Sequence, residues 1–288
     1  MKDKFTISSG DLSATVLMPE SPEYARTRFD HSAFVPDVMY KGVHFGRPEQ
    51  LDSSKPSTNG AGLCCELICP GAELAVNVGE EFVKPGVGYI VRGEKPWFFT
   101  DRAPYRPLET TVTVQDDRAL FVTESEMRGG IAYRECRMLR AEDNRLTLNV
   151  HFENQGEKPL DMLEFCHNFV SLGDLPVDER YHLALPCVRM IAPDEKSHLT
   201  AERGGVTWDK APEATFFNVF EDVQPVDGYA WRLYHDESRA AISETVDFAP
   251  VRLTVWGLNH VVSAEAFHHI ALQPGESADW TRVWTFEA

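Results

Sequence analysis

Two ionisable residues lie in otherwise apolar runs of this sequence. Glu265 falls within 262–267 (VSAEAF), and His167 falls within 162–170 (MLEFCHNFV), next to Asn168. A charge in an apolar run is costly to bury unless it is paired or has a chemical role. A histidine and a carboxylate that face one pocket are the minimum for acid–base catalysis, because one donates a proton while the other accepts one. A lone histidine on an apolar face is more often a hydrogen-bonded core residue, so the pattern alone leaves both interpretations open.

The elements that must position these two residues are β-strands. Segment 145–153 alternates strictly between apolar and polar residues, and its inward side chains are Leu146, Leu148, Val150 and Phe152. By the same period of two, Phe165, His167 and Phe169 share one strand face with Leu163. Further strands are expected at 12–18, within 29–45, and at 119–124, 131–139 and 251–256, with a turn at 274–276 before a final strand.

No segment shows a sustained apolar stripe at helical spacing, and turn signals recur along the chain, a pattern typical of all-β sandwiches. We therefore predict antiparallel sheets. Because no linker or composition shift divides the chain, we expect a single domain over residues 1–288. The long loop 46–62 is rich in small polar residues and is either functional or surface decoration.

Composition narrows the class of ligand. The formal charge of −17 argues against a nucleic-acid partner and against anionic membrane surfaces. The N-terminus has no hydrophobic signal core and no apolar run is as long as a membrane span, so a soluble cytoplasmic protein is the default expectation. The six cysteines are expected as free thiols, and the C-C-x-x-x-C group at 64–69 lacks zinc-site spacing, so no metal is expected.

Several motifs follow one another in an order that resembles a known family. They are TRFDHSA at 27–33, GAGLCCE at 60–66, KPGVG at 84–88, EFCHNF at 164–169, and SAEAF at 263–267 followed by PGE at 274–276. In this order they resemble bacterial proteins of the galactose mutarotase-like (aldose 1-epimerase-like) superfamily. The resemblance implies a β-supersandwich fold with a sugar site on a concave sheet face, and the partner of the protein would be a small-molecule sugar.

The resemblance also implies roles for the two ionisable residues. Glu265 would be the general base that removes the anomeric hydroxyl proton, and His167 the general acid that protonates the ring oxygen. The sugar ring would open, rotate about C1–C2 and close on its other face, without a cofactor. A non-catalytic carbohydrate-binding protein on the same fold is the alternative. A glycoside hydrolase or lyase is a third, and a hydrolase would need a second carboxylate facing Glu265, for which Glu66 is the candidate.

The candidate substrate-binding residues are Arg28, Glu66, Lys84, Asn168, Trp256 and His260. Arg28 is more readily explained by an ion pair with Asp30 than by ligand contact, and Glu66 by either a sugar contact or a pair with Lys84. Trp256 and Trp231 could each stack on a sugar ring, although aromatic residues in a β core more often pack. His260 is expected near the pocket mouth, and Arg137 at a solvated position.

Two departures from the family pattern leave the sugar open. No histidine occurs between residues 84 and 100, and Ala264 replaces the usual proline of the last motif. The acidic charge disfavours a phosphorylated sugar, although Arg28, Lys84 and Arg92 could form a local basic patch. A homodimer is one oligomeric state that the sequence leaves open.

Overall fold

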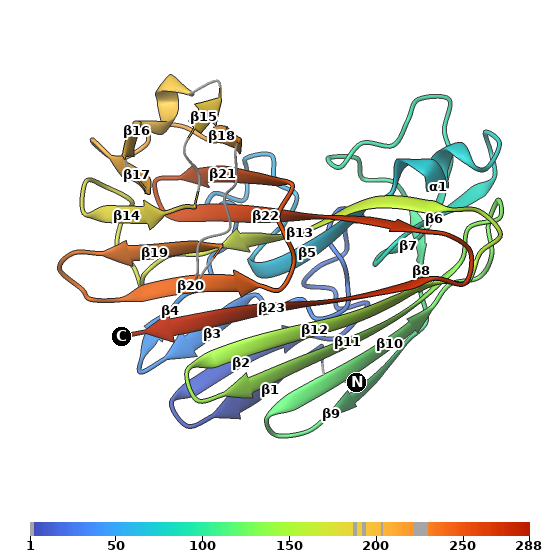
Figure 1. The fold of residues 1–288 in the computed structure, drawn as a ribbon, viewed down its shortest axis with the longest axis horizontal. Coiled ribbons are helices and arrows are strands. Elements are labelled where there is room, and N and C mark those ends of the chain that lie inside the picture. The colour runs from blue at the N-terminus through green and yellow to red at the C-terminus, as the bar shows by residue number, and fades with distance from the viewer. Residues whose placement is uncertain (1–2, 187–188, 192–193, 203, 222–229) are drawn as a thin grey trace.

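The chain folds into antiparallel sheets with very little helix in a computed structural model (Figure 1). The structure describes residues 3–186, 189–191, 194–202, 204–221 and 230–288. Two large sheets face each other, and smaller elements cover their edges and ends. The prediction of an all-β sandwich is confirmed.

The larger sheet has ten strands. In spatial order they are β16 (Leu199–Glu202), β17 (Gly205–Trp208), β14 (Tyr181–Ala184), β19 (Trp231–His235), β20 (Ala241–Val246), β23 (Ser277–Glu287), β12 (Arg145–Asn154), β11 (Tyr133–Glu142), β10 (Arg118–Glu124) and β9 (Thr110–Val114). Its long central strands run across the lower half of Figure 1.

The second sheet has six strands and carries the candidate site. In spatial order they are β15 (Arg189–Ile191), β18 (Phe216–Glu221), β21 (Arg252–Leu258), β22 (Val261–Leu272), β13 (Leu160–Phe169) and β5 (Gly62–Ile68).

The remaining elements flank these two sheets. A four-stranded sheet contains β1 (Lys4–Ser9), β2 (Leu12–Leu17), β3 (Asp37–Tyr40) and β4 (Val43–His44). A three-stranded sheet contains β6 (Glu81–Lys84), β7 (Gly88–Val91) and β8 (Tyr105–Pro107). The helical pieces are α1 (Pro70–Leu74) and a 3-10 turn (Glu195–Ser197). Within the described ranges, no helix has the length and apolar character needed to cross a membrane.

The predicted alternation of β12 is confirmed: Leu146, Leu148, Val150 and Phe152 are buried, and the residues between them are partly or fully exposed. The predicted turn at 274–276 is also present, between β22 and β23. Gly275 there has a φ of 82°, a conformation that residues with a Cβ seldom adopt. This turn returns the chain from the six-stranded sheet to the centre of the ten-stranded sheet (Figure 1).

Charged side chains are buried between the two large sheets. Arg282 on β23 contacts Glu164 on β13 at 2.6 Å and Glu244 on β20 at 2.6 Å, so a single guanidinium links the sheets. All three side chains are 1 % exposed or less. Such a network is stable only while every charge keeps its partner.

A second buried cluster corrects two expectations. Arg137 is not solvated but buried, and its guanidinium contacts Asp30 at 2.5 Å and Glu135 at 2.9 Å. Asp30 therefore pairs with Arg137 rather than with Arg28, its near neighbour in sequence. Tertiary packing decides these partners because both carboxylates enter the interior and need a cation there.

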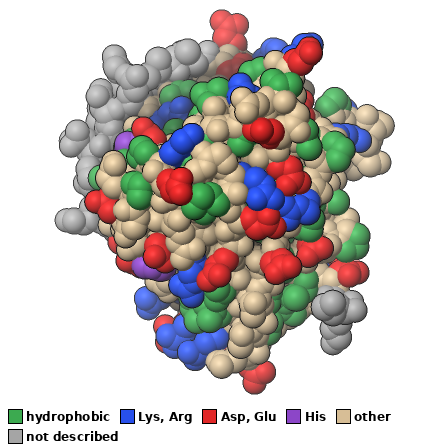
Figure 2. All heavy atoms as spheres, turned by 90° about the vertical axis from the view of Figure 1, so that its right-hand side faces the viewer, with side chains coloured by type: hydrophobic (Ala, Val, Ile, Leu, Met, Phe, Trp, Pro, Cys, Tyr) green, Lys and Arg blue, Asp and Glu red, His purple; other side chains and the backbone are tan. Residues whose placement is uncertain are grey.

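Other ion pairs lie on the surface and are exposed to solvent. Arg106 contacts Glu81 and Glu126 close to β6–β8, with distances of 2.9 and 2.8 Å. On the face shown in Figure 2, basic and acidic side chains are intermixed. Exposed pairs of this kind contribute little to stability, about 0–1 kcal/mol each.

Candidate active site

The pairing of β13 with β22 opens at the two ionisable residues. The strands pair from Leu160 with Leu272 to Glu164 with His268, and they meet again at the bridge between Val170 and Val262. The register is the same on both sides of the gap. In that register, His167 lies directly opposite Glu265.

Side chains replace the missing ladder bonds in this gap. The backbone N–H of Asn168 donates to the Ser263 hydroxyl at 3.1 Å, and the Asn168 side-chain amide donates to the Ala264 carbonyl at 2.6 Å. These two bonds give the Asn168 amide groups partners inside the gap, although the Nδ1 atom of His167 is buried without a partner among the described residues. The gap lets the two ionisable side chains meet on one face.

His167 and Glu265 contact each other. The His167 Nε2 atom lies 3.1 Å from Glu265 Oε1, and both side chains are almost fully buried. The carboxyl group also accepts hydrogen bonds from the Thr254 hydroxyl at 2.5 Å and the Ser263 hydroxyl at 3.0 Å. Both oxygens of Glu265 are therefore fixed in position.

Burial determines the protonation of the Glu265 carboxyl. Loss of solvation raises its pKa to about 7, against the hydrogen bond from Thr254 and the charge of Arg28, which favour the ionised form. Glu265 can therefore gain or lose a proton near neutral pH, as an acid–base catalyst must.

Aromatic rings enclose the imidazole of His167. The ring stacks on Phe169 with 3.8 Å between centroids, and it meets the rings of Phe29 and Trp256 edge to face. Burial, together with the nearby charge of Arg28, holds the pKa of His167 well below its usual value. The imidazole is therefore neutral near pH 7, and its Nε2 faces the Glu265 carboxyl.

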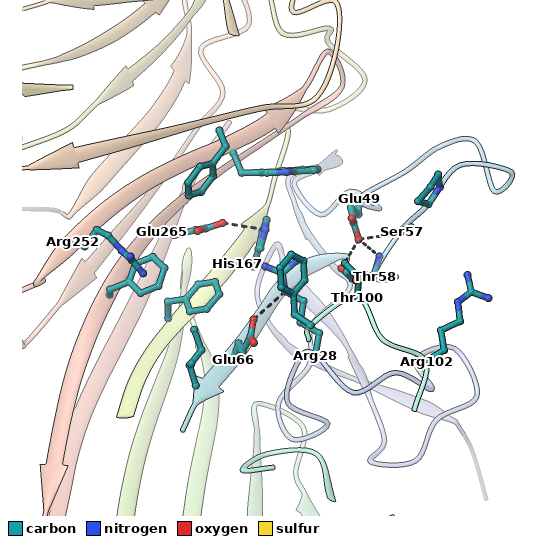
Figure 3. A pocket seen from close by; sticks show the side chains of 17 residues that line it. Arg28, Glu49, Ser57, Thr58, Glu66, Thr100, Arg102, His167, Arg252 and Glu265 are labelled. Atoms are coloured by element: carbon teal, nitrogen blue, oxygen red, sulfur yellow. Dashed lines mark hydrogen bonds and ion pairs between the residues drawn. The ribbon is translucent and has the colours of Figure 1, made fainter. Parts of the chain in front are cut away.

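The pair lies on the floor of a cavity of about 600 Å³ (Figure 3). Cavities of this size hold small organic ligands. The floor is the outer face of the six-stranded sheet, and the loops 46–62 and 97–102 form walls. Phe165, Phe217 and Phe267 add apolar lining from the sheet.

Three of the six predicted binding residues line this cavity: Arg28, Glu66 and Trp256. The Arg28 Nε donates to Glu66 at 3.0 Å, and its guanidinium lies over the rings of Phe29 and Phe99 at 4.7 and 4.5 Å. Nearby carboxylates, chiefly Glu66, raise the pKa of Arg28 despite its burial. Arg28 and Glu66 therefore form a fixed polar pair at the cavity wall.

The structure places Lys84, Asn168 and His260 outside the lining of this cavity. Lys84 is buried behind it and donates to the Leu67 carbonyl at 2.5 Å, with Glu66 at 3.9 Å. Asn168 follows His167 on β13, so its side chain points to the opposite face, into the interior. His260 lines a separate hollow and lies 3.1 Å from the Pro48 carbonyl.

Trp231 also has no place in the cavity. It is fully buried between the sheets, where its indole N–H donates to Glu244 at 2.5 Å. Of the two tryptophans considered for sugar stacking, only Trp256 presents its ring to the cavity.

Glu49 lines the cavity from loop 46–62 and was not among the residues predicted from the sequence. One oxygen of its carboxylate accepts hydrogen bonds from the Ser57 hydroxyl at 2.9 Å, and from the Thr58 amide and hydroxyl at 2.8 and 2.6 Å. The loop is anchored at Gly60, where a Cβ would come within 2.2 Å of the Phe169 ring. The length and polarity of this loop are the sequence features that could have indicated a functional residue in it.

Two arginines of the lining were also missed. Arg102 comes from loop 97–102 and Arg252 from β21. Neither lies in a recognisable motif, and the assignment of Arg252 to the cavity depends on which face of β21 is outward. Thr254 and Trp256, on the same face of β21, surround the acid–base pair.

Among the described residues, no group of three or more His, Cys, Asp or Glu side chains could hold a metal ion. Cys64, Cys65, Cys69, Cys136 and Cys166 are free thiols. Cys187, the sixth cysteine, lies outside the described residues.

Fold and site together define a β-sandwich protein with a buried histidine–carboxylate pair on the floor of a ligand-sized cavity. No family model matches the chain, and no curated protein matches it. Solved structures do match. A galactose mutarotase-like protein from Clostridium acetobutylicum aligns over 98% of this chain and 94% of its own, with a TM-score of 0.62 and 11% identity.

Two further structures give the same result. A galactose mutarotase related enzyme from Lactobacillus acidophilus covers 99% of this chain and 97% of its own, with a TM-score of 0.57 and 12% identity. An aldose epimerase homologue from C. elegans covers 99% and 98%, with a TM-score of 0.56 and 13% identity. The chain therefore has the galactose mutarotase-like fold, as the sequence resemblance predicted.

Proposed function

We propose that this protein interconverts the anomers of an aldose, a reaction of the aldose 1-epimerase type. The observation that supports this most directly is the placement of His167 opposite Glu265, in contact on the floor of the cavity. Ring opening of a sugar needs one group that accepts the anomeric proton and one that donates to the ring oxygen. The names of the structural neighbours from Lactobacillus acidophilus and C. elegans agree with this chemistry.

In the reactive form, the His167 and Glu265 side chains together hold one proton more than an ionised carboxylate and a neutral imidazole would hold. Before the sugar binds, this proton lies on Glu265, because burial disfavours both the carboxylate and the imidazolium. When sugar oxygens enter between the groups, the proton passes to His167 and the carboxylate becomes the base. Glu265 then accepts the anomeric proton as His167 donates to the ring oxygen, and closure of the ring on its other face returns both protons.

Other lining residues would hold the sugar. Glu49 and Glu66 are carboxylates whose positions are fixed by hydrogen bonds, and they can accept hydrogen bonds from sugar hydroxyls. The half-buried ring of Trp256 can cover the apolar C–H face of a pyranose. The proposed reaction needs no cofactor.

A non-catalytic sugar-binding protein is the second candidate. It is favoured by one observation: the His167 imidazole and the Thr254 and Ser263 hydroxyls already contact both oxygens of the Glu265 carboxyl. Saturation-transfer NMR of a panel of aldohexoses separates the two functions. Exchange between anomers faster than the spontaneous rate supports the enzyme, whereas binding by calorimetry without faster exchange supports the binding protein.

The pH dependence of exchange gives a prediction of its own. The pKa of Glu265 is raised to about 7, so the pair holds its extra proton below that pH and loses it above. We expect kcat/KM to fall about tenfold per pH unit above roughly pH 7. Because the pKa of His167 is lowered, kcat/KM should stay level for at least a unit below pH 7.

The profile is measured by exchange NMR between pH 5 and 9, after subtraction of the spontaneous, buffer-catalysed rate. A kcat/KM that instead rises through pH 7 would show that the ionised carboxylate with neutral imidazole is the active form. That result would contradict the protonation state proposed for the reactive His167–Glu265 pair.

A further inference from the structure

The cavity contains an arginine that no carboxylate neutralises. Arg252 is partly buried on β21, and its guanidinium lies 4.0 Å from the centroid of the Phe267 ring. Its Nε is buried and has no hydrogen-bond partner among the described residues. Every other partly or fully buried arginine whose side chain the structure describes has a hydrogen bond or an ion pair within the protein.

This exception is notable in an acidic chain. The formal charge of −17 gives carboxylates a large excess over cations, so a surface arginine readily finds a partner. The cations expected to form a basic patch are occupied: Arg28 pairs with Glu66, Lys84 donates to the Leu67 carbonyl, and Arg92 donates to the Val76 carbonyl. Among the described cations of the lining, Arg252 and the exposed Arg102 are left with unused donors, and of these two only Arg252 lies on the floor sheet with His167 and Glu265.

The distance between Arg252 and the His167–Glu265 pair is comparable to the size of a sugar ring. Arg252 pairs with Phe267 in the ladder between β21 and β22, and Thr254 pairs with Glu265. Arg252 therefore lies two residues, about 7 Å, along the strand from the level of Glu265. That spacing is of the order of the span from the anomeric carbon of a pyranose to a substituent on the far side of its ring. Figure 3 shows Arg252 beside the pair and on the same sheet.

We propose that the sugar bound in this cavity carries an anionic group, a phosphate or a carboxylate, which Arg252 binds. The inference rests on the proposed function, since it places the anomeric carbon at His167 and Glu265. The planar guanidinium presents several N–H donors to such an oxyanion, and stacking on Phe267 holds the plane in place before the ligand arrives. A neutral sugar would leave the buried Nε without a partner.

The test compares common aldohexoses, each as the neutral sugar, its 6-phosphate and its uronic acid. Binding is measured by calorimetry with wild type, Arg252→Gln and Arg252→Lys. In wild type, one anionic form should bind about ten- to a hundredfold more tightly than its neutral counterpart. Arg252→Gln should remove this preference, and Arg252→Lys should keep only part of it because it retains the charge without the planar fork.

Arg145→Gln is the matched control. Arg145 is exposed and outside the cavity, and its replacement changes the net charge by the same amount. The preference should survive in this variant and should weaken with added salt in wild type. The phosphate and carboxylate arms identify which anion is recognised.

Two results would overturn the inference: equal or tighter binding of neutral sugars by wild type, or an unchanged preference in Arg252→Gln. Binding does not depend on catalysis, so the two proposals fail separately. Preferential binding of an anionic sugar without anomer exchange would refute the proposed function alone. Exchange that is equally fast for neutral and anionic sugars, with equal affinities, would refute the role of Arg252 alone.

Discussion

Replacing Glu265 with Gln is expected to abolish catalysed anomer exchange. The amide has nearly the shape of the carboxyl group and can still accept the hydrogen bond from Thr254. It cannot accept the anomeric proton, so the rate should fall by about 10²–10⁴-fold, the usual contribution of a general acid or base. Saturation-transfer NMR on the best substrate measures the loss.

The protein should remain folded after this change. Burial raises the pKa of Glu265 to about 7, so near neutral pH the native site already tolerates the neutral form of this side chain. A thermal unfolding curve close to that of wild type would show this directly. Glu276→Gln, in the exposed turn between β22 and β23, is the matched control and should leave exchange intact. Undiminished exchange in a folded Glu265→Gln protein would refute the assignment of Glu265 as the base.

Replacing Arg282 with Met is expected to lower the free energy of unfolding strongly. Arg282 donates to both oxygens of Glu164 and to Glu244, and all three side chains are buried between the sheets. Methionine would fill much of the volume but would leave two buried carboxylates without their cation. Removing one partner of a buried ion pair costs about 3–5 kcal/mol. Urea unfolding at pH 7 measures the change in the free energy of unfolding.

The reason for the loss can be tested with further variants. Adding Glu164→Gln and Glu244→Gln to Arg282→Met removes the stranded charges, so part of the lost stability should return. Arg145→Met exchanges an exposed arginine for the same residue and should change stability by no more than about 0.5 kcal/mol. If the free energy of unfolding of Arg282→Met lay within about 1 kcal/mol of the wild-type value, the buried network would contribute little to holding the two sheets together.

The strands and their faces were predictable because side-chain alternation is a local property. A period of two in 145–153 determines which residues of β12 are buried, whatever the strand pairs with. The same rule placed Phe165, His167 and Phe169 on one face of β13, where the structure has Phe165 and His167 lining the cavity and Phe169 stacked on the imidazole. The polarity of His167 and Glu265 within apolar runs was likewise visible without a structure.

Most charge partners were not predictable, because they depend on contacts between distant segments; the pair of Glu66 with Lys84, one of two interpretations of Glu66, is present at 3.9 Å. Arg28 and Asp30 are two residues apart, yet Arg28 pairs with Glu66 and Asp30 with Arg137. Lys84 begins the KPGVG motif of the family pattern, yet its amine is buried outside the cavity lining, where it donates to the Leu67 carbonyl. Arg252 carried no signal in sequence, because its importance lies in having no partner after the chain has folded.

The sequence by itself determined the β-sandwich and the two residues most suited to acid–base chemistry. Only the tertiary structure placed them opposite each other, where β13 and β22 separate. It also raised the pKa of Glu265 and lowered that of His167, since both shifts come chiefly from burial by other strands and loops. Strand pairing and desolvation are non-local, and this is the physical reason why the sequence could indicate the two groups but not their arrangement.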